Sequence, residues 1–201
     1  MVIATVVLLK NLVNKGKIKM KYNTPAYQAI SSFYGDRKAK RSQQPLIKHI
    51  DEGLLILDKL GADNDIKDAF CIHPLIQNNE DEFTWKNFNI SKKAIDYAFK
   101  YKYFANSYLC RPENDHIQSY THLKKHFKGK KIPKPVALML IADKVQNQSD
   151  FRKYHQNHKR AKQLDRYFIN WCIFLILHTV FDAKEQLKII QAGIEFKDEV
   201  R

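Results

Sequence analysis

The chain has little cysteine, glycine and proline for its 201 residues. Six glycines and six prolines are too few for a loop-rich all-β protein or a low-complexity filament. The three cysteines, Cys71, Cys110 and Cys172, are widely spaced and form no Cys-x-x-Cys pair, so they indicate neither a disulfide framework nor a zinc knuckle. A reducing compartment suits such cysteines, and we expect the protein to be cytoplasmic.

Long apolar runs are also missing. The amino-terminal segment Val2–Leu9 is apolar but only eight residues long, far short of a membrane span. Its lysines follow rather than precede it, and no small-residue cleavage site comes after it, which is atypical of a signal peptide. We therefore expect no membrane partner, an amino-terminal extension over residues 1–19 and one domain over residues 20–201.

Acidic residues are scarce, with 21 Asp and Glu against 35 Lys and Arg, for a net charge of +14. Residues 1–48 hold 10 basic and 1 acidic side chain, and residues 121–165 hold 12 and 3, whereas residues 49–120 hold 8 and 12. Two basic blocks bracketing an acidic middle favour a polyanionic partner, either a phosphorylated nucleotide or a nucleic acid. A lysine-rich surface that only keeps the protein soluble explains the same numbers. The oligomeric state is not indicated.

The apolar residues recur at helical spacing nearly throughout, and at 44% hydrophobic and 12% aromatic the composition argues against disorder. The pattern predicts helices over about 26–34, 46–60, 65–76, 91–109, 120–127, 136–145, 160–181 and 183–191. No internal repeat is present, and no convincing strand pattern follows the first ten residues. The predicted fold class is therefore all-α, as one helical bundle.

Three residues on predicted helices carry the clearest chemical signal. His49 lies one turn into its helix, and His73 lies within the apolar stripe of the next one. Asp143 falls in the strongly apolar run that begins at Val136, where an unpaired carboxylate would be costly. Two imidazoles and a carboxylate suit a divalent metal ion. Ordinary explanations remain, because a buried histidine can simply be hydrogen-bonded and Asp143 can pair with Lys144.

Four short motifs follow one another along the chain. They are Lys40-Arg41-Ser42-Gln43-Gln44-Pro45-Leu46-Ile47-Lys48-His49, Ala69-Phe70-Cys71-Ile72-His73-Pro74, Leu140-Ile141-Ala142-Asp143-Lys144-Val145-Gln146-Asn147 and Arg166-Tyr167-Phe168-Ile169-Asn170-Trp171. The first three resemble the metal-binding elements of RelA/SpoT-type hydrolases of the HD superfamily, and the fourth resembles a helix of the small metazoan SpoT homologue. Order and spacing agree over residues 25–181. Similar proteins in tailed-phage genomes suggest a phage-encoded member of this family.

The resemblance implies an HD-domain-like helical bundle with pyrophosphohydrolase activity on a purine nucleotide. It implies that His49, His73 and Asp143 are three of four ligands of a divalent metal, typically manganese. It also implies a set of substrate-binding residues: Lys40, Arg41, Ser42, Lys144, Asn147 and Tyr167. Of these, Asn147 and Tyr167 would lie near the base or sugar of the nucleotide.

The chain departs from the family at its catalytic positions. Pro74 stands where the family has the aspartate of its His-Asp doublet, and its side chain cannot ligate a metal. Gln77 and Asn78 stand at the position of the acidic catalytic pair, and amides cannot act as general bases. That loss alone lowers a rate by roughly 10²–10⁴-fold. An acidic residue of 80–82 could substitute, or that segment could be a solvated turn.

Two functions therefore stay open. The first is a divergent phosphohydrolase that uses metal-activated water. The second is a catalytically degenerate HD domain that binds a nucleotide, RNA or a protein partner without turnover.

Two other segments could bind a ligand. The lysines of residues 111–134 are interleaved with aromatic residues, a mixture that could grip phosphates and stack on bases, although an exposed loop needs no ligand. His155 and His158 form an i,i+3 pair that could bind metal or phosphate, or lie in an ordinary solvated loop. Trp85 and the tyrosines of Tyr97–Tyr108 recur near helical spacing and are predicted to lie in the core.

Overall fold

The computed structural model describes residues 22–40, 42–77, 84–109, 119–155 and 157–198. These residues form eight α-helices and one short 3-10 helix, with no strand among them apart from an isolated bridge between Lys38 and Pro45. The all-α fold predicted from the sequence is confirmed. The predicted extension over residues 1–19 lies outside the described residues.

The first group of helices matches the predicted elements closely. Its members are α2 (Pro25–Tyr34), α3 (Ile47–Lys59), α4 (Asn64–Gln77), η2 (Thr84–Asn87) and α5 (Lys92–Ser107). The side chain of Thr24 accepts a hydrogen bond from the backbone of Tyr27 at the start of α2, and Ser91 caps α5 in the same way. Gly61 follows α3 with a φ of 72°, a conformation that favours glycine.

The second group departs more from the prediction. It comprises α6 (Tyr120–His126), α7 (Lys134–Tyr154), α8 (Ala161–His178) and α9 (Ala183–Asp198). Helix α7 continues nine residues past the predicted end at Val145, although the residues after Val145 are mostly polar. Its last turns are held against α8, because Phe151 is buried and both Gln148 and Arg152 donate hydrogen bonds to Asp165. Helix α9 likewise runs past its predicted end.

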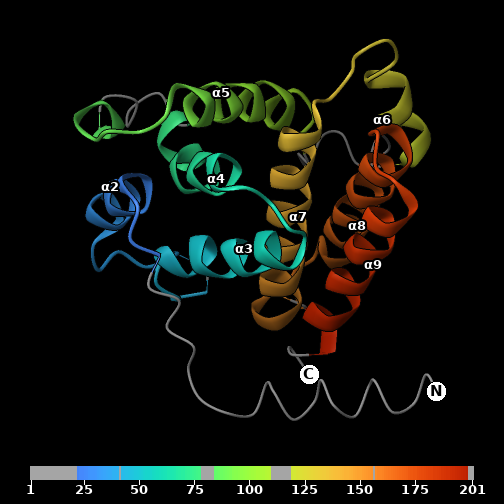
Figure 1. The fold of residues 1–201 in the computed structure, drawn as a ribbon. Coiled ribbons are helices and arrows are strands. Elements are labelled where there is room, and N and C mark those ends of the chain that lie inside the picture. Colours follow the sequence, from blue (N-terminus) through green and yellow to red (C-terminus); the bar gives the residue numbers. More distant parts are fainter. Residues whose placement is uncertain (1–21, 41, 78–83, 110–118, 156, 199–201) are drawn as a thin grey trace, which may run out of the picture.

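Helix α7 is the axis of the molecule. It packs against α3, α4 and α5 on one side and against α8 and α9 on the other, and α6 covers α8 (Figure 1). This position explains why three polar residues in the carboxyl-terminal half of α7 are buried, namely Lys144, Gln146 and Gln148. No helix in the described part of the chain is both long and apolar enough to cross a bilayer.

A close helix contact brings the two histidine-bearing helices together. Gly53 of α3 faces the ring of Phe70 on α4, and a Cβ at Gly53 would collide with that buried ring. His49 lies one turn before Gly53, and His73 lies one turn after Phe70. The centroids of the two imidazole rings are consequently only 5.5 Å apart.

The segment between α2 and α3 is folded back on itself. The backbone N–H of Ala39 donates to the carbonyl of Gln44 at 2.8 Å, and that of Leu46 donates to Arg37 at 2.9 Å. Gln43, at the tip, has a φ of 57°. The turn places Ser42 and Gln44 against the carboxyl-terminal half of α7, where they line the cavity described below.

Candidate metal centre

The three residues predicted as metal ligands meet at one point from three helices. One possible ligand atom from each of His49 on α3, His73 on α4 and Asp143 on α7 lies within 4.8 Å of the other two. Nε2 of His49 is 3.5 Å from Oδ1 of Asp143. Two ligand atoms about 2.1 Å from one tetrahedral ion lie about 3.4 Å apart, so this pair already has the spacing of a metal site. The group could therefore hold a metal ion.

Hydrogen bonds present both imidazoles in the same tautomer. Nδ1 of His73 donates to the backbone carbonyl of Phe70 at 2.6 Å, and Nδ1 of His49 lies 2.5 Å from Oε1 of Gln146. Because both partners are carbonyl oxygens, Nδ1 carries the proton in each ring. The lone pair of each Nε2 is left for a ligand, and such outer partners are typical of metal-bound histidines.

His73 is held in the form that a metal requires. Its side chain is buried, and burial followed by the neighbouring His49 lowers the pKa of His73 to about 3. The ring is therefore neutral at physiological pH, and a neutral imidazole is the ligating form.

Asp143 uses its two oxygens for different partners. Oδ2 pairs with Nζ of Lys144 at 2.8 Å, whereas Oδ1 accepts from Nδ2 of Asn147 at 2.7 Å and faces His49. Burial alone would raise the pKa of Asp143, but Lys144 and the imidazoles of His49 and His73 outweigh it and lower the pKa to about 2. The sequence left open a metal-binding role and a pair with Lys144 for Asp143, and in the structure Oδ2 pairs with Lys144 while Oδ1 faces His49.

Lys144 is enclosed by aromatic rings of α8. Its ammonium lies 5.6 Å from the ring centroid of Tyr167 and 5.8 Å from that of Trp171. Burial opposes its charge, but the Asp143 carboxylate outweighs burial and raises the pKa of Lys144. Tyr167 itself is buried and donates its hydroxyl to the carbonyl of Tyr108 at 3.0 Å.

A cavity of ≈ 420 Å³ opens beside the three candidate ligands. Its lining includes most of the predicted site residues that the structure describes: Ser42, His49, His73, Gln77, Asp143, Lys144 and Asn147. Lys40 is exposed on the adjacent turn and Tyr167 is buried on α8, and the lining includes neither of them. Arg41, Asn78 and the acidic segment 80–82 lie outside the described residues.

The two altered family positions on α4 face the same cavity. Pro74 and Gln77 both line it, Pro74 one turn before the carboxyl end of the helix and Gln77 as its last residue. Nε2 of Gln77 donates to Oδ1 of Asn106 on α5 at 2.6 Å. This side of the cavity therefore presents a proline and an amide pair rather than carboxylates.

The sequence assigned no role at the site to four residues that line or adjoin the cavity: Lys48, Glu52, Gln146 and Asp150. Nζ of Lys48 lies 3.2 Å from the hydroxyl of Tyr154 and 3.5 Å from Oε1 of Glu52. Burial, followed by the nearby Glu52, raises the pKa of Asp150. Asp150 lies seven residues after Asp143 on one face of α7, a spacing that could have identified it.

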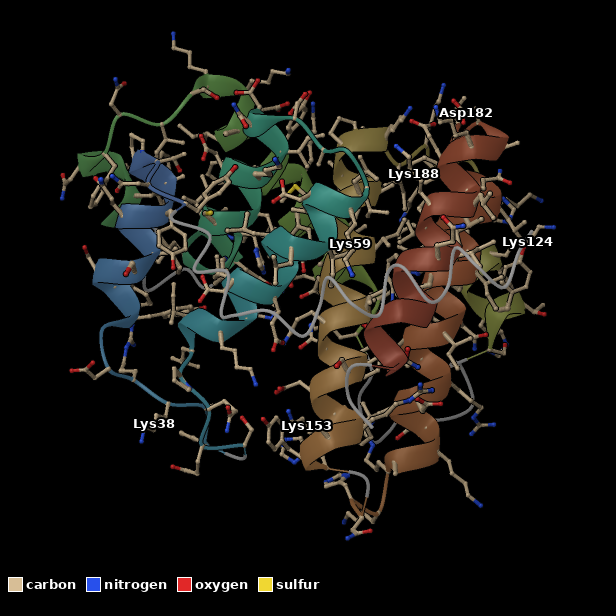
Figure 2. The ribbon with its side chains drawn as sticks, turned by 60° about the horizontal axis from the view of Figure 1, so that its bottom comes forward. Lys38, Lys59, Lys124, Lys153, Asp182 and Lys188 are labelled. Atoms are coloured by element: carbon tan, nitrogen blue, oxygen red, sulfur yellow. The ribbon has the colours of Figure 1, made fainter. Side chains whose placement is uncertain are left out.

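None of the described residues of the other predicted ligand segments lines the cavity. Helix α6 packs on α8 through Leu123 and Phe127, while Lys124 and the lysines that follow it are exposed. Figure 2 shows that labelled lysines 38, 59, 124, 153 and 188 project from different elements around the molecule. His155 and His158 lie near Phe151, with ring centroids 5.9 and 6.5 Å from its ring.

The predicted core aromatic residues divide between the interior and the surface. Trp85, Tyr101 and Tyr108 are buried, and Tyr101 also lines the cavity. Tyr103, in contrast, is 58% exposed.

Comparison with known proteins gave no significant match to a protein-family model, a curated protein or a solved structure. The chain is an all-helical bundle in which His49, His73 and Asp143 could hold a metal ion of unknown identity.

Proposed function

We propose that the protein is a divergent HD-type, metal-dependent phosphohydrolase that acts on a phosphorylated nucleotide. The observation that carries this proposal is the convergence of His49, His73 and Asp143 beside a cavity of ≈ 420 Å³. The resemblance to guanosine tetraphosphate pyrophosphohydrolases favours a purine nucleotide as substrate and manganese as the metal.

Three protein ligands suit a catalytic rather than a purely structural ion. Closed structural sites use four protein ligands, whereas catalytic sites use three and keep a position open for water or substrate. A divalent ion held here supplies Lewis acidity and lowers the pKa of a bound water. The chain itself supplies the Nε2 atoms of two imidazoles and an ionised carboxylate, and Asn147 and Lys144 fix the orientation of that carboxylate.

The charges that line the cavity indicate that nucleotide binding depends on the ion. The lining contains two lysines, Lys48 and Lys144, and two carboxylates, Asp143 and Asp150. The two lysines and two carboxylates balance, so these side chains give the cavity no net positive charge for a phosphate. A divalent ion provides that charge, so we expect chelation to abolish nucleotide binding as well as turnover.

A screen of mono-, di- and tetraphosphate nucleotides with added manganese tests the proposal. We expect phosphate or pyrophosphate release from at least one purine nucleotide, and none after chelation or in an Asp143→Asn variant. Absence of turnover for every nucleotide would contradict the hydrolase. In that case, a nucleotide that binds only in the presence of manganese would still support the proposed metal site.

A second candidate function is nucleotide binding without turnover. The amide pair of Gln77 and Asn106 favours it, because neither side chain can accept a proton from water. Under this alternative the metal and the phosphate still meet in the cavity, but nothing replaces the missing base. Equilibrium binding of a nucleotide that survives a day of incubation uncleaved would favour this alternative.

A further inference from the structure

A chain of hydrogen bonds leads from Glu52 on α3 through Gln146 on α7 to His49. Nε2 of Gln146 donates to Oε2 of Glu52 at 3.0 Å, and Oε1 of Gln146 lies 2.5 Å from Nδ1 of His49. Gln146 is only 3% exposed, so water does not compete for these bonds. Neither Glu52 nor Gln146 belongs to the residues for which the family resemblance implies a role.

The direction of this chain follows from the chemistry of its first member. An ionised carboxylate only accepts hydrogen bonds, so the amide nitrogen of Gln146 must face Glu52. The amide oxygen therefore faces His49, and Nδ1 of that ring must carry the proton. The lone pair then lies on Nε2, the atom 3.5 Å from Oδ1 of Asp143.

The orientation of the His49 ring depends on a side-chain hydrogen bond, whereas that of the His73 ring does not. His73 is buried, and its Nδ1 is held by a backbone carbonyl of its own helix. The His49 side chain is 24% exposed, and its Nδ1 partner is a side chain from another helix. Among the described residues the group of candidate ligands has only these three members, and Pro74 adds none, so the group depends on the orientation of His49.

We infer that Gln146 and Glu52 are positioning residues that hold His49 as an Nε2 metal ligand. This role rests on the proposed function, because it concerns the same metal site. The pair acts through hydrogen-bond polarity: Glu52 orients the amide, and the amide selects the tautomer. Outer partners of this kind typically contribute 10–100-fold to metal affinity.

The tautomer can be measured in the metal-free protein by ¹⁵N NMR of the histidine ring nitrogens. We expect His49 to carry its proton on Nδ1 in the wild type and to lose that preference in Gln146→Leu. His73 provides an internal reference, because its backbone partner is unchanged. Gln148→Leu is the matched control, since Gln148 is a buried glutamine of α7 that also donates to a carboxylate, Asp165.

Metal affinity provides the second measurement. Competition with a chelator should give a manganese affinity 10–100-fold weaker in Gln146→Leu and unchanged in Gln148→Leu. A double variant, Gln146→Glu with Glu52→Gln, exchanges the two groups but still presents an acceptor to Nδ1. It should retain the wild-type tautomer and bind manganese within a few-fold of the wild type.

The inference is overturned if Gln146→Leu keeps the Nδ1 proton on His49, or if the exchanged pair binds metal no better than Gln146→Leu. Failure of the proposed function gives a different result. In that case the wild type binds no manganese, while the tautomer of the metal-free protein still reports on the role of Gln146.

Discussion

Two helices line the cavity with different side chains: the α7 wall of the cavity includes Asp143, Lys144 and Asn147, and the α4 wall includes His73, Pro74 and Gln77. The two walls differ in the chemical groups that they present. On α7, Asp143 is ionised, buried and held by Lys144 and Asn147. On α4, His73 is a well-oriented ligand, but Pro74 and Gln77 bring no charge to the same cavity. The α7 wall could hold a cation, whereas the described residues of the α4 wall, up to Gln77, include no carboxylate in the lining.

Under the proposed function, holding an ion and using it for hydrolysis depend on different residues of the cavity. Ligands need buried, oriented lone pairs, and those come from contacts among α3, α4 and α7. A base needs only a carboxylate at the right point, and its loss leaves the packing unchanged. The variants that follow change the α4 wall, the α7 wall or the contact between α3 and α4.

The largest effect is expected from adding carboxylates to the α4 wall. Gln77→Glu combined with Asn78→Asp should raise manganese-dependent nucleotide turnover by roughly 10²–10⁴-fold, because it supplies a general base. Initial rates at saturating nucleotide measure the gain. Asn106→Asp, which adds a carboxylate at the neighbouring position on α5, is the control. A turnover that stays at the wild-type level would show that the α4 wall is not what limits the reaction.

Removing the Asp143 carboxylate from the α7 wall should lower the free energy of unfolding strongly. Asp143→Ala leaves the ammonium of Lys144 buried without its partner, which typically costs about 3–5 kcal/mol. Urea unfolding measures the free energy. Asp96→Ala removes an exposed i,i+4 partner of Lys100 and should cost at most about 1 kcal/mol. Equal losses in the two variants would contradict a buried ion pair at Asp143.

Separating the two histidine-bearing helices should affect both walls moderately. Gly53→Ala forces the ring of Phe70 to move, and overpacking of this kind costs about 1–3 kcal/mol. Because Phe70 lies between Gly53 and His73, manganese affinity should fall with stability. A variant with full stability and full affinity would show that the close approach of α3 and α4 is not needed.

The effect that is smallest near neutral pH is a pH dependence of the metal-free protein, which grows on acidification. The pKa of His73 is lowered from about 6.5 to about 3, so the unfolded chain binds the additional proton when the pH falls below about 6.5. Stability is therefore fully present above pH 6.5 and falls on acidification, with a limiting slope of about 1.4 kcal/mol per pH unit. His73→Gln should lack this loss between pH 6.5 and 4. If the free energy of unfolding of the wild type and of His73→Gln changed in parallel with pH, a buried neutral His73 would be contradicted.

The elements and the three candidate ligands could be predicted from the sequence because their signals are local. Thr24 and Ser91 are cap residues, and His73 stands in an apolar stripe. The end of α7 could not be predicted, because its last turns are polar and are held by contacts with α8 such as that of Gln148 with Asp165.

The outer partners of the metal site could not be predicted for the same reason. Glu52 and Gln146 are 94 residues apart, and no spacing along the chain indicates that their side chains meet. Lys144 was predicted as a possible partner of Asp143 because it is adjacent in sequence, but its position between Asp143 and the α8 rings is a tertiary feature.

Metal uptake by the stripped protein tests the central claim most directly. Equilibrium titration with manganese should give one ion per chain for the wild type and no measurable uptake for His73→Gln or Asp143→Asn. An absence of uptake by the wild type, or equal uptake by all three proteins, would contradict the assignment of His49, His73 and Asp143 as a metal centre.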